Sequence, residues 1–362
     1  MSIRRRPDAP ELDWVGGHRG LESQLVPPAG FRLRMLPLRS LRSVEANVHL
    51  VLDPIRLAVS VPQAVWWLLR HRPAAVFTTG GYVAIPVLIA ARLLGIPALL
   101  WEGNVIPGRS VRATAPLASA IAVSFGATCA ALTTKRQCFA TGTPIRDVTA
   151  IDRLAARDRL GLPSYARVIV VFGGSQAARR LNGAVTGALP HLVEKLHVIH
   201  LTGPDGLAAA EAARRELPDP LRPRYRPAAF LGEGLLDALA ASDLVVGRAG
   251  SSTLAECAAF GLPIVVVPYP YAGAHQKANA AELVDGGAAL YVEDDAFDSA
   301  ALIDAVAILD DPERHATMAA AARRLAKPYA ADAVAELTMA LAERRPLPSA
   351  DAVAALAAGA AR

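Results

Sequence analysis

Short apolar runs alternate with longer amphipathic stretches along most of the chain. The runs occupy residues 75–78, 98–101, 120–123, 168–172, 198–201, 244–246 and 264–267. Runs of this length, bounded by turn residues, are typical of parallel strands that are covered on both faces. Several of them end in glycine or small polar residues and are followed by a helical pattern. This repeated order of strand, tight turn and helix predicts doubly wound α/β folding with right-handed crossovers.

A change of pattern near the middle of the chain predicts two domains. A polar helix is predicted over 151–160, and Gly161-Leu162-Pro163-Ser164 separates it from the next apolar run. We expect a first domain over 1–147 and a second over 148–325. The helix of 326–343 can pack back on the first domain, and the residues of 344–362, rich in Ala and Pro, are interpreted as a tail. A length of 362 residues agrees with two domains of ordinary size.

The composition excludes a disordered or a membrane-spanning protein. Hydrophobic residues make up 53% of the chain and charged residues 20%, which suits sheets covered by helices. The most apolar window, 83–101, is interrupted by two prolines, an arginine and a glycine, so we predict no transmembrane helix. The N-terminus has positive charge but no apolar segment behind it, which predicts a chain without a secretory signal that stays in the cytoplasm.

The three cysteines predict neither a disulfide framework nor a zinc site. Cys129, Cys138 and Cys257 are odd in number and lack C-x-x-C spacing. We therefore expect reduced thiols that pack as small core residues.

The net charge of +5 is concentrated in the first quarter of the chain. Seven arginines are interleaved there with apolar residues: Arg32, Arg34, Arg39, Arg42, Arg56, Arg70 and Arg72 among residues such as Leu50, Ile55, Val59, Trp66 and Leu69. Such a mixture can bind the surface of an anionic bilayer, because apolar burial and charge attraction both contribute to the binding free energy. The alternative is an ordinary amphipathic helix that packs on its own sheet. No helix-turn-helix or ribonucleoprotein pattern accompanies the charge, so we expect no nucleic-acid partner.

A first glycine turn, Gly173-Gly174-Ser175-Gln176, follows the run 168–172 and opens a helix. Glycine lets the backbone approach a ligand closely, and the start of a helix offers unpaired N–H groups and positive potential. A diphosphate fits such a turn, although a plain connection would have the same sequence. Arg146 and Arg248 are the candidates for a contact to phosphate, and the sequence leaves the choice open.

A second turn, from Arg248 through Gly250, Ser251 and Ser252, also ends a strand and starts a helix. Ser251 or Ser252 is predicted as the N-cap. Glu256 lies four positions after Ser252, on the same helical face and one turn deeper than the helix start. A carboxylate there can accept hydrogen bonds from both hydroxyls of a ribose whose phosphates bind the helix start.

A third segment, His275 to Ala280, follows the run 264–267 beyond the carboxyl end of a strand, where open α/β sheets bind ligands. Gln276 is predicted to contact sugar hydroxyls, and Asn279 to cap or tie the loop. No D-x-D pair follows a strand, and Asp294 and Asp295 lie on a polar loop, so no metal site is predicted.

Together these segments resemble the MurG family of N-acetylglucosaminyltransferases. The family's G-G-S-Q turn, R-x-G-x-x-T-x-x-E helix start and H-Q-x-x-N-A loop correspond to the three segments above. Its G-G-Y-x-x-x-P and H-E-x-N-x-x-x-G segments correspond to Gly80–Pro86 and to the region of Glu102, Asn104 and Gly108, and its hinge to 141–146. The resemblance implies a GT-B fold, with two Rossmann-like doubly wound parallel-sheet domains facing a cleft.

The resemblance also implies the ligands. UDP-N-acetylglucosamine is expected on the second domain at Arg146, Gly174, Ser175, Gln176, Arg248, Gly250, Ser251, Ser252, Glu256 and Gln276. Lipid I is expected on the first domain at Gly80, Gly81, Tyr82 and Asn104. The implied reaction is an inverting transfer to the C4 hydroxyl of N-acetylmuramic acid without a cofactor or a metal, at the cytoplasmic face of the membrane and by a peripheral protein. Another GT-B transferase with a lipid acceptor and a catalytically dead UDP-sugar-binding scaffold remain as alternatives.

One expected segment of the family is missing. Family members begin with a strand and a G-G-T-G-G-H turn that serves the acceptor, whereas Gly16-Gly17-His18 here matches the family's second turn by its surroundings. We therefore expect a first domain that lacks its first strand and glycine loop, with residues 1–10 outside the sheet. No catalytic base is assigned.

Overall fold

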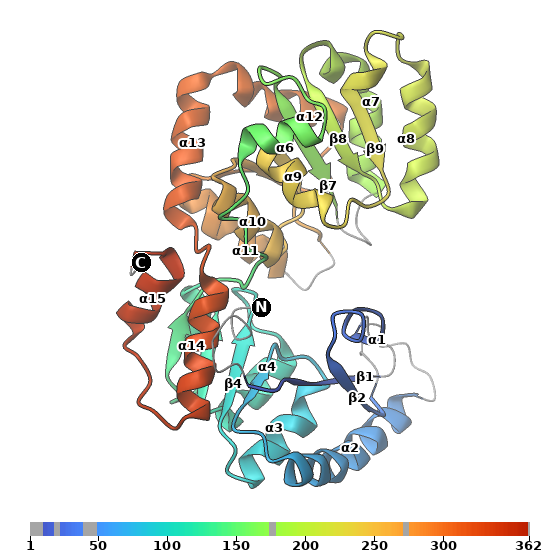
Figure 1. Ribbon diagram of the computed structural model, residues 1–362. Helices are drawn as coiled ribbons and strands as arrows, with labels where there is room; N and C mark the ends of the chain where they lie inside the picture. The colour runs from blue at the N-terminus through green and yellow to red at the C-terminus, as the bar shows by residue number, and fades with distance from the viewer. Residues whose placement is uncertain (1–9, 18–21, 39–48, 174–178, 271–274, 361–362) are drawn as a thin grey trace. The chain divides into compact units, whose positions relative to one another are not determined.

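The computed structural model describes residues 10–17, 22–38, 49–173, 179–270 and 275–360, with the side chains of 49–54 left aside. The chain forms two compact units (Figure 1). Unit 1 comprises Met1–Gly142 together with Tyr329–Arg362, and unit 2 comprises Thr143–Pro328. Every strand pairing among these described residues is parallel, which confirms the predicted α/β class.

Unit 2 contains one six-stranded sheet in the order β12-β11-β10-β7-β8-β9. Its strands are β7 (Val168–Phe172), β8 (His197–Leu201), β9 (Tyr225–Ala228), β10 (Leu244–Gly247), β11 (Ile264–Val266) and β12 (Ala289–Tyr291). Its helices are α6 (Arg153–Arg159), α7 (Arg179–Lys195), α8 (Pro204–Glu216), α9 (Gly234–Ala241), α10 (Ser251–Phe260), α11 (His275–Asp285), α12 (Ser299–Val306) and α13 (Pro312–Leu325). The chain runs outward from β7 to β9, returns to the middle at β10 and then runs outward the other way, so the sheet is doubly wound.

The two faces of this sheet belong to two separate cores. Ile169 and Val171 of β7 pack with residues of α7 and α12, whereas Val168 and Val170 pack with residues of α6 and α9. Alternate residues of a strand point to opposite faces, so a strand that is apolar at every position is buried on both faces of the sheet. This is the physical basis of the continuous apolar run in the sequence.

Unit 1 carries two parallel sheets that are not hydrogen-bonded to each other within the described residues. One pairs β1 (Asp13–Gly17) with β2 (Arg32–Leu36), and the other has the order β3-β4-β5-β6, formed by Val76–Thr78, Ala98–Glu102, Ala120–Val123 and Cys138–Ala140. The helices that connect these strands along the chain are α1 (Glu22–Leu25), α2 (His49–His71), α3 (Ala84–Leu93), α4 (Arg109–Thr114) and α5 (Ala127–Ala131). His18 and residues 1–9 lie outside the described residues.

The C-terminal residues complete unit 1. Helices α14 (Ala330–Ala342) and α15 (Ala350–Ala358) return to it, and Figure 1 shows α14 beside β4. Leu337 and Val353 of these helices pack in one core with Leu99 and Phe139 of the four-stranded sheet. Helices α2 and α3 contribute to the core on its other face. The residues interpreted as a tail therefore include a packed helix.

No helix within the described ranges is long and apolar enough to cross a membrane. The longest of them is α2, with 23 residues.

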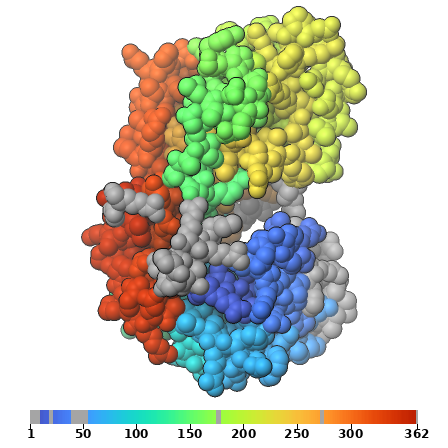
Figure 2. All heavy atoms as spheres, in the orientation of Figure 1, coloured from blue at the N-terminus to red at the C-terminus, as the bar shows by residue number. Residues whose placement is uncertain are grey.

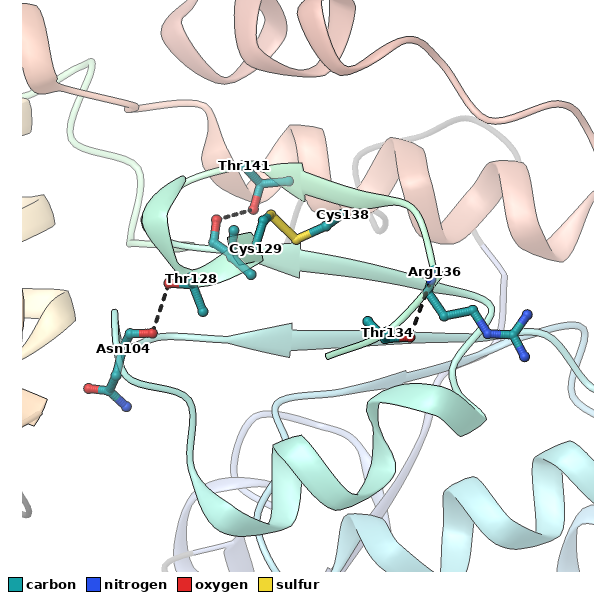
Figure 3. Close-up of a disulfide and its surroundings, with 8 residues drawn as sticks. Asn104, Thr128, Cys129, Thr134, Arg136, Cys138 and Thr141 are labelled. Atoms are coloured by element: carbon teal, nitrogen blue, oxygen red, sulfur yellow. Dashed lines mark hydrogen bonds between the residues drawn. A yellow bond between two sulfur atoms is a disulfide. The ribbon is translucent and has the colours of Figure 1, made fainter. Parts of the chain in front are cut away.

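A disulfide joins Cys129 of α5 to Cys138 of β6, so the expectation of reduced thiols is wrong for this pair (Figure 3). The chain reverses between the short helix and the edge strand, which brings the two Cα atoms to 5.8 Å, within the range that a disulfide requires. A spacing of nine residues gave no sign of this, because the approach depends on the turn. Cys257 is free and buried, as expected.

Opening this disulfide is expected to lower the free energy of unfolding of unit 1 by about 2–3 kcal/mol, because the cross-link closes a short loop and restricts the unfolded chain. The test replaces both Cys129 and Cys138 with Ser and measures denaturant unfolding with and without a thiol reductant. Reductant should destabilise the parent chain and leave the double variant unchanged. Equal stability of the parent chain under both conditions would contradict the prediction.

Candidate functional site

Two glycine turns leave the sheet of unit 2 side by side. Strands β7 and β10 are neighbours, and Phe172 pairs with Gly247 at their carboxyl ends. The turn after β7 therefore starts at Gly173 beside the turn that starts at Arg248. This is the point where the strand order reverses, and open α/β sheets bind ligands outside the carboxyl ends of strands at that point.

The close approach of the two strands depends on Gly247. A Cβ atom at that position would lie 2.8 Å from the carbonyl oxygen of Phe172, which is closer than real Cβ atoms come to backbone. A side chain there would push the two turns apart. The glycine thus keeps both turns within reach of one ligand.

Helix α10 begins at Ser251, and Gly250 is its N-cap, with extended backbone at φ −70° and ψ 140°. The prediction of a serine N-cap is wrong, since no side chain caps this helix and both serines lie inside its first turn. The chain leaves the sheet in an extended conformation and turns helical directly after the glycine. As a result the amides of Ser251 and Ser252 belong to the first turn, where N–H groups have no partner within the helix and the helix dipole is positive. Gly174, Ser175 and Gln176 lie outside the described residues.

Glu256 lies one turn further along α10 and is 8% exposed. Its Oε1 atom accepts a hydrogen bond from Nη2 of Arg146 at 3.2 Å. Arg146 also donates from Nη1 to the carbonyl oxygen of Gly232. The structure thus brings together two of the predicted site residues, which are 110 positions apart. Glu256 keeps a second carboxylate oxygen that this bond does not use.

Arg248, by contrast, is buried in an internal network. Its Nη1 group donates to the carbonyl oxygen of Val267 at 2.9 Å and to Oδ1 of Asp294 at 2.5 Å, and the guanidinium lies over the ring of Tyr269. The side chain is 7% exposed. Of the two arginines that the sequence left open, Arg146 has the more exposed side chain, at 42%. Sequence reasoning missed the role of Asp294, which it placed on a polar loop.

The start of α11 is held near the carboxyl ends of β10 and β11. Gln276 accepts a hydrogen bond through Oε1 from the backbone N–H of Tyr269 at 2.9 Å, a bond that does not involve its Nε2 group. Asn279 is buried and donates to the carbonyl oxygen of Ala249 at 3.2 Å. Asn279 therefore ties the loop to the second glycine turn, as predicted. The contact of Gln276 with a sugar stays a prediction.

A buried polar network fixes the first turn of α7. His200 of β8 is fully buried and contacts the Tyr225 hydroxyl through Nδ1 at 2.8 Å and Oδ1 of Asn182 through Nε2 at 3.0 Å. Asn182 donates from Nδ2 to the carbonyl oxygen of Thr202, which leaves Oδ1 to accept from the imidazole. Nε2 therefore carries the proton of a neutral imidazole, and burial lowers the pKa of His200 to about 4.

The predicted acceptor residues of unit 1 lie at the ends of neighbouring strands. Gly80 and Gly81 follow β3 and both have positive φ, at 76° and 80°. A Cβ at Gly80 would lie 2.6 Å from the side chain of Val111, so this turn requires glycine for conformation and for space. Tyr82 follows in the same turn, two residues before the first residue of α3.

Asn104 follows β4, the strand that pairs with β3. The buried carboxylate of Glu102 accepts from the backbone N–H and side-chain Nδ2 of Asn104, and its other oxygen accepts from the N–H of Gly108. The Asn104 carbonyl accepts from the hydroxyl of Thr128 at 3.0 Å (Figure 3). Glu102 therefore folds its own loop, and Asn104 is positioned from two sides.

Comparison with known proteins gives one consistent result. The glycosyltransferase family 28 N-terminal domain matches residues 6–123, and the glycosyltransferase family 28 C-terminal domain matches residues 168–336. Two relatives carry the name UDP-N-acetylglucosamine–N-acetylmuramyl-(pentapeptide) pyrophosphoryl-undecaprenol N-acetylglucosamine transferase. The one from Chlorobium limicola is 35% identical over 92% of this chain and 91% of its own length, and the one from Gloeobacter violaceus is 39% identical over 90% of each.

Solved structures agree. MurG of Acinetobacter baumannii is 28% identical and superposes with a TM-score of 0.71 over 91% of each chain. A UDP-GlcNAc 2-epimerase from Neisseria meningitidis, 11% identical with a TM-score of 0.60 over 88% of each chain, shares the fold alone.

The buried imidazole predicts a pH dependence of stability. The unfolded chain binds a proton at His200 below about pH 6.5, whereas the folded chain does so only near pH 4, so stability should fall as the pH drops through this window. Between pH 7 and pH 5 this one group is expected to contribute a loss of about 2 kcal/mol. Urea unfolding of the parent and of His200→Gln, which hydrogen-bonds but does not titrate, measures the difference. Identical pH slopes for the two proteins would refute it.

Proposed function

The chain belongs to glycosyltransferase family 28 and, within it, to the MurG family, and on this basis we propose that it transfers N-acetylglucosamine from UDP-N-acetylglucosamine to lipid I. The acceptor group is the C4 hydroxyl of the N-acetylmuramic acid, and the product is lipid II of peptidoglycan synthesis. Unit 2 binds the donor and unit 1 binds the acceptor.

The observation that carries the proposal is the convergence of the two glycine turns with Glu256. The turns after β7 and β10 start at paired residues, and the Glu256 carboxylate lies one helical turn from the start of α10. A nucleoside diphosphate has its phosphates and its ribose hydroxyls at a comparable spacing. The donor therefore places its diphosphate on the first turn of α10 and its ribose on Glu256.

Donor binding changes the partner of Glu256. Nη2 of Arg146 pairs with this carboxylate at 3.2 Å. Two ribose hydroxyls satisfy both carboxylate oxygens by hydrogen bonding, and the guanidinium is then able to turn to the diphosphate. Arg146 is thus able both to pair with Glu256 and to supply positive charge to the diphosphate.

The leaving group in this reaction is UDP, on which negative charge grows as the glycosidic bond breaks. Oriented amides at a helix start stabilise such charge without reorganisation at the moment of reaction. The first turn of α10 and the guanidinium of Arg146 take this role. Transfer with inversion then requires that the acceptor hydroxyl attack the anomeric carbon from the side opposite to UDP and give its proton to a general base as UDP leaves.

We further propose that α2 docks unit 1 on an anionic membrane surface. Ile55, Val59, Trp66 and Leu69 are each more than half exposed, and their spacing places them on one face of this helix. The residues Ser60, Ala64 and Leu68, on the opposite face, are buried. In Figure 2 the light blue residues, which include α2 and α3, lie on the surface of unit 1.

Basic residues accompany this apolar face. Arg56 and Arg70 lie on the same helix, and Arg72 follows it. An apolar stripe with basic neighbours binds an anionic bilayer through buried area and charge together. The lipid-linked acceptor is held in such a bilayer, so a peripheral position at the cytoplasmic face of the membrane places unit 1 next to its substrate.

A transfer assay tests the main proposal. The purified chain is incubated with radiolabelled UDP-N-acetylglucosamine and lipid I, and lipid II is measured together with calorimetric binding of UDP. Binding of UDP together with formation of lipid II supports the proposal. Binding without transfer would instead favour a UDP-sugar-binding scaffold, and transfer to another lipid acceptor would favour a different transferase of the same fold.

Replacing Glu256 with Ala is expected to weaken UDP binding by about ten- to a hundredfold, because the ribose loses hydrogen bonds to a charged group. Calorimetry with UDP and with 2′-deoxy-UDP measures the effect. The parent chain should prefer UDP, and the variant should bind the two nucleotides equally. Retention of the preference by the variant would exclude Glu256 from the ribose site.

Replacing both Trp66 and Leu69 with Ser is expected to reduce binding to vesicles of phosphatidylglycerol by about tenfold or more, since two apolar side chains no longer enter the bilayer. Flotation of the protein with vesicles measures binding. Tyr165→Ser, at a residue of unit 2 that is 87% exposed, is the matched control and should bind as the parent does. Equal flotation of all three proteins would rule out docking through α2.

A further inference from the structure

The loop after β12 carries three consecutive acidic residues, Glu293, Asp294 and Asp295. Strand β12 is the edge strand of the unit 2 sheet, three positions away from β7. Despite that distance, the loop contacts the segments that follow the inner strands. Glu293 pairs with Lys277 of α11 at 2.7 Å, and Asp294 pairs with two arginines.

The two carboxylate oxygens of Asp294 have different partners. Oδ1 accepts from Nη1 of Arg248 at 2.5 Å, and Oδ2 lies 3.3 Å from Nε of Arg180. Arg180 also donates from Nη1 to the backbone carbonyl of Asp295. One carboxylate therefore fixes both guanidinium groups relative to each other.

Each arginine belongs to one of the two glycine turns. Arg180 is the second residue of α7, which follows the turn at Gly173, and Arg248 opens the turn that leads to α10. The Arg248 side chain is 7% exposed and that of Asp294 is 15% exposed, whereas that of Arg180 is 49% exposed. The pair with Arg248 is thus an internal anchor, and Arg180 is the member that can meet a ligand.

Orientation matters here because a flexible arginine loses side-chain freedom when it binds phosphate. A guanidinium that is already held through Nε has lost that freedom before the ligand arrives, so more of the interaction appears as affinity. Arg180 is held through Nε by Asp294 and through Nη1 by the carbonyl of Asp295, so Nη2 is the terminal nitrogen that neither of these contacts uses.

We propose that Asp294 is a positioning residue of the donor site, which anchors Arg248 and thereby orients Arg180 toward the diphosphate of the nucleotide sugar. This inference rests on the proposed function, since it takes the nucleotide sugar as the ligand of unit 2. It adds Arg180 as a phosphate contact and Asp294 as the group through which that contact is arranged.

The test compares UDP with uridine, which has the ribose and base but no phosphate. Calorimetry or competition binding is carried out on the full chain and on Asp294→Asn. We expect the dissociation constant of UDP to rise about tenfold, in line with losing a charge-assisted contact, while that of uridine changes less than about twofold. Asp295→Asn removes the same charge from an exposed neighbouring side chain and should leave both constants unchanged.

A second variant keeps the proposal open to refutation if Asp294→Asn fails to fold. Arg180→Gln changes a half-exposed side chain and should weaken UDP but not uridine. In the double variant the loss of binding free energy for UDP should be smaller than the sum of the two single losses, because Asp294 acts in part through Arg180. A role of Asp294 in folding alone would lower the affinity for UDP and uridine equally, or change only the melting temperature.

The outcomes separate the two proposals. If the parent chain binds UDP and both variants bind it equally well, the positioning role is wrong and the proposed function stands. If Asp294→Asn weakens uridine as much as UDP, the positioning role is wrong as well. If the parent chain binds neither UDP nor UDP-N-acetylglucosamine, the proposed function fails and the inference fails with it.

Discussion

The pairing of β7 with β10 is the constraint on which the rest of unit 2 depends. These two parallel strands form the middle of the sheet, and the chain leaves them in opposite directions along it. Helices α7 and α10 therefore both begin near the carboxyl ends of these strands, and their positive ends face the same space. Gly247 makes this possible, because any side chain at that position would meet the backbone of Phe172. Glu256, Arg248 and the acidic loop all take their positions from this one edge.

The inner strands could be predicted because burial on both faces demands apolar residues at every position. Strands β6, β9 and β12 could not, since each lies at an edge of its sheet or contains polar residues, as β9 does at Arg226. Whether such a segment is a strand depends on the neighbour that it pairs with, which the local sequence does not contain. The separation of unit 1 into two sheets is likewise a matter of pairing, although the helix return after Pro328 had a local sign in the helical pattern.

The candidate site divides in the same way. Glu256 was predictable because it and the helix start are related by the helical repeat alone, within one element. The partner of Arg248 was not, because Asp294 follows 46 positions later and meets it only through the strand order β12-β11-β10. The N-cap of α10 was misassigned for a smaller reason: serine is a good cap, but Gly250 already occupies the extended position before the helix. The pairing of Cys129 with Cys138 similarly depends on a chain reversal that the residue types between them do not predict.

The return of the C-terminal helices to unit 1 has a consequence for biosynthesis. All the residues of unit 2 are present in the growing chain once Pro328 has been added, before any of the returning segment of unit 1 has been made. Unit 1 begins first yet finishes last, because Leu337 and Val353 supply part of the core around Leu99 and Phe139. During translation one face of the β3–β6 sheet remains uncovered until α14 and α15 emerge. Loss of residues 330–358 would therefore uncover the core around Leu99 and Phe139, far earlier in the chain.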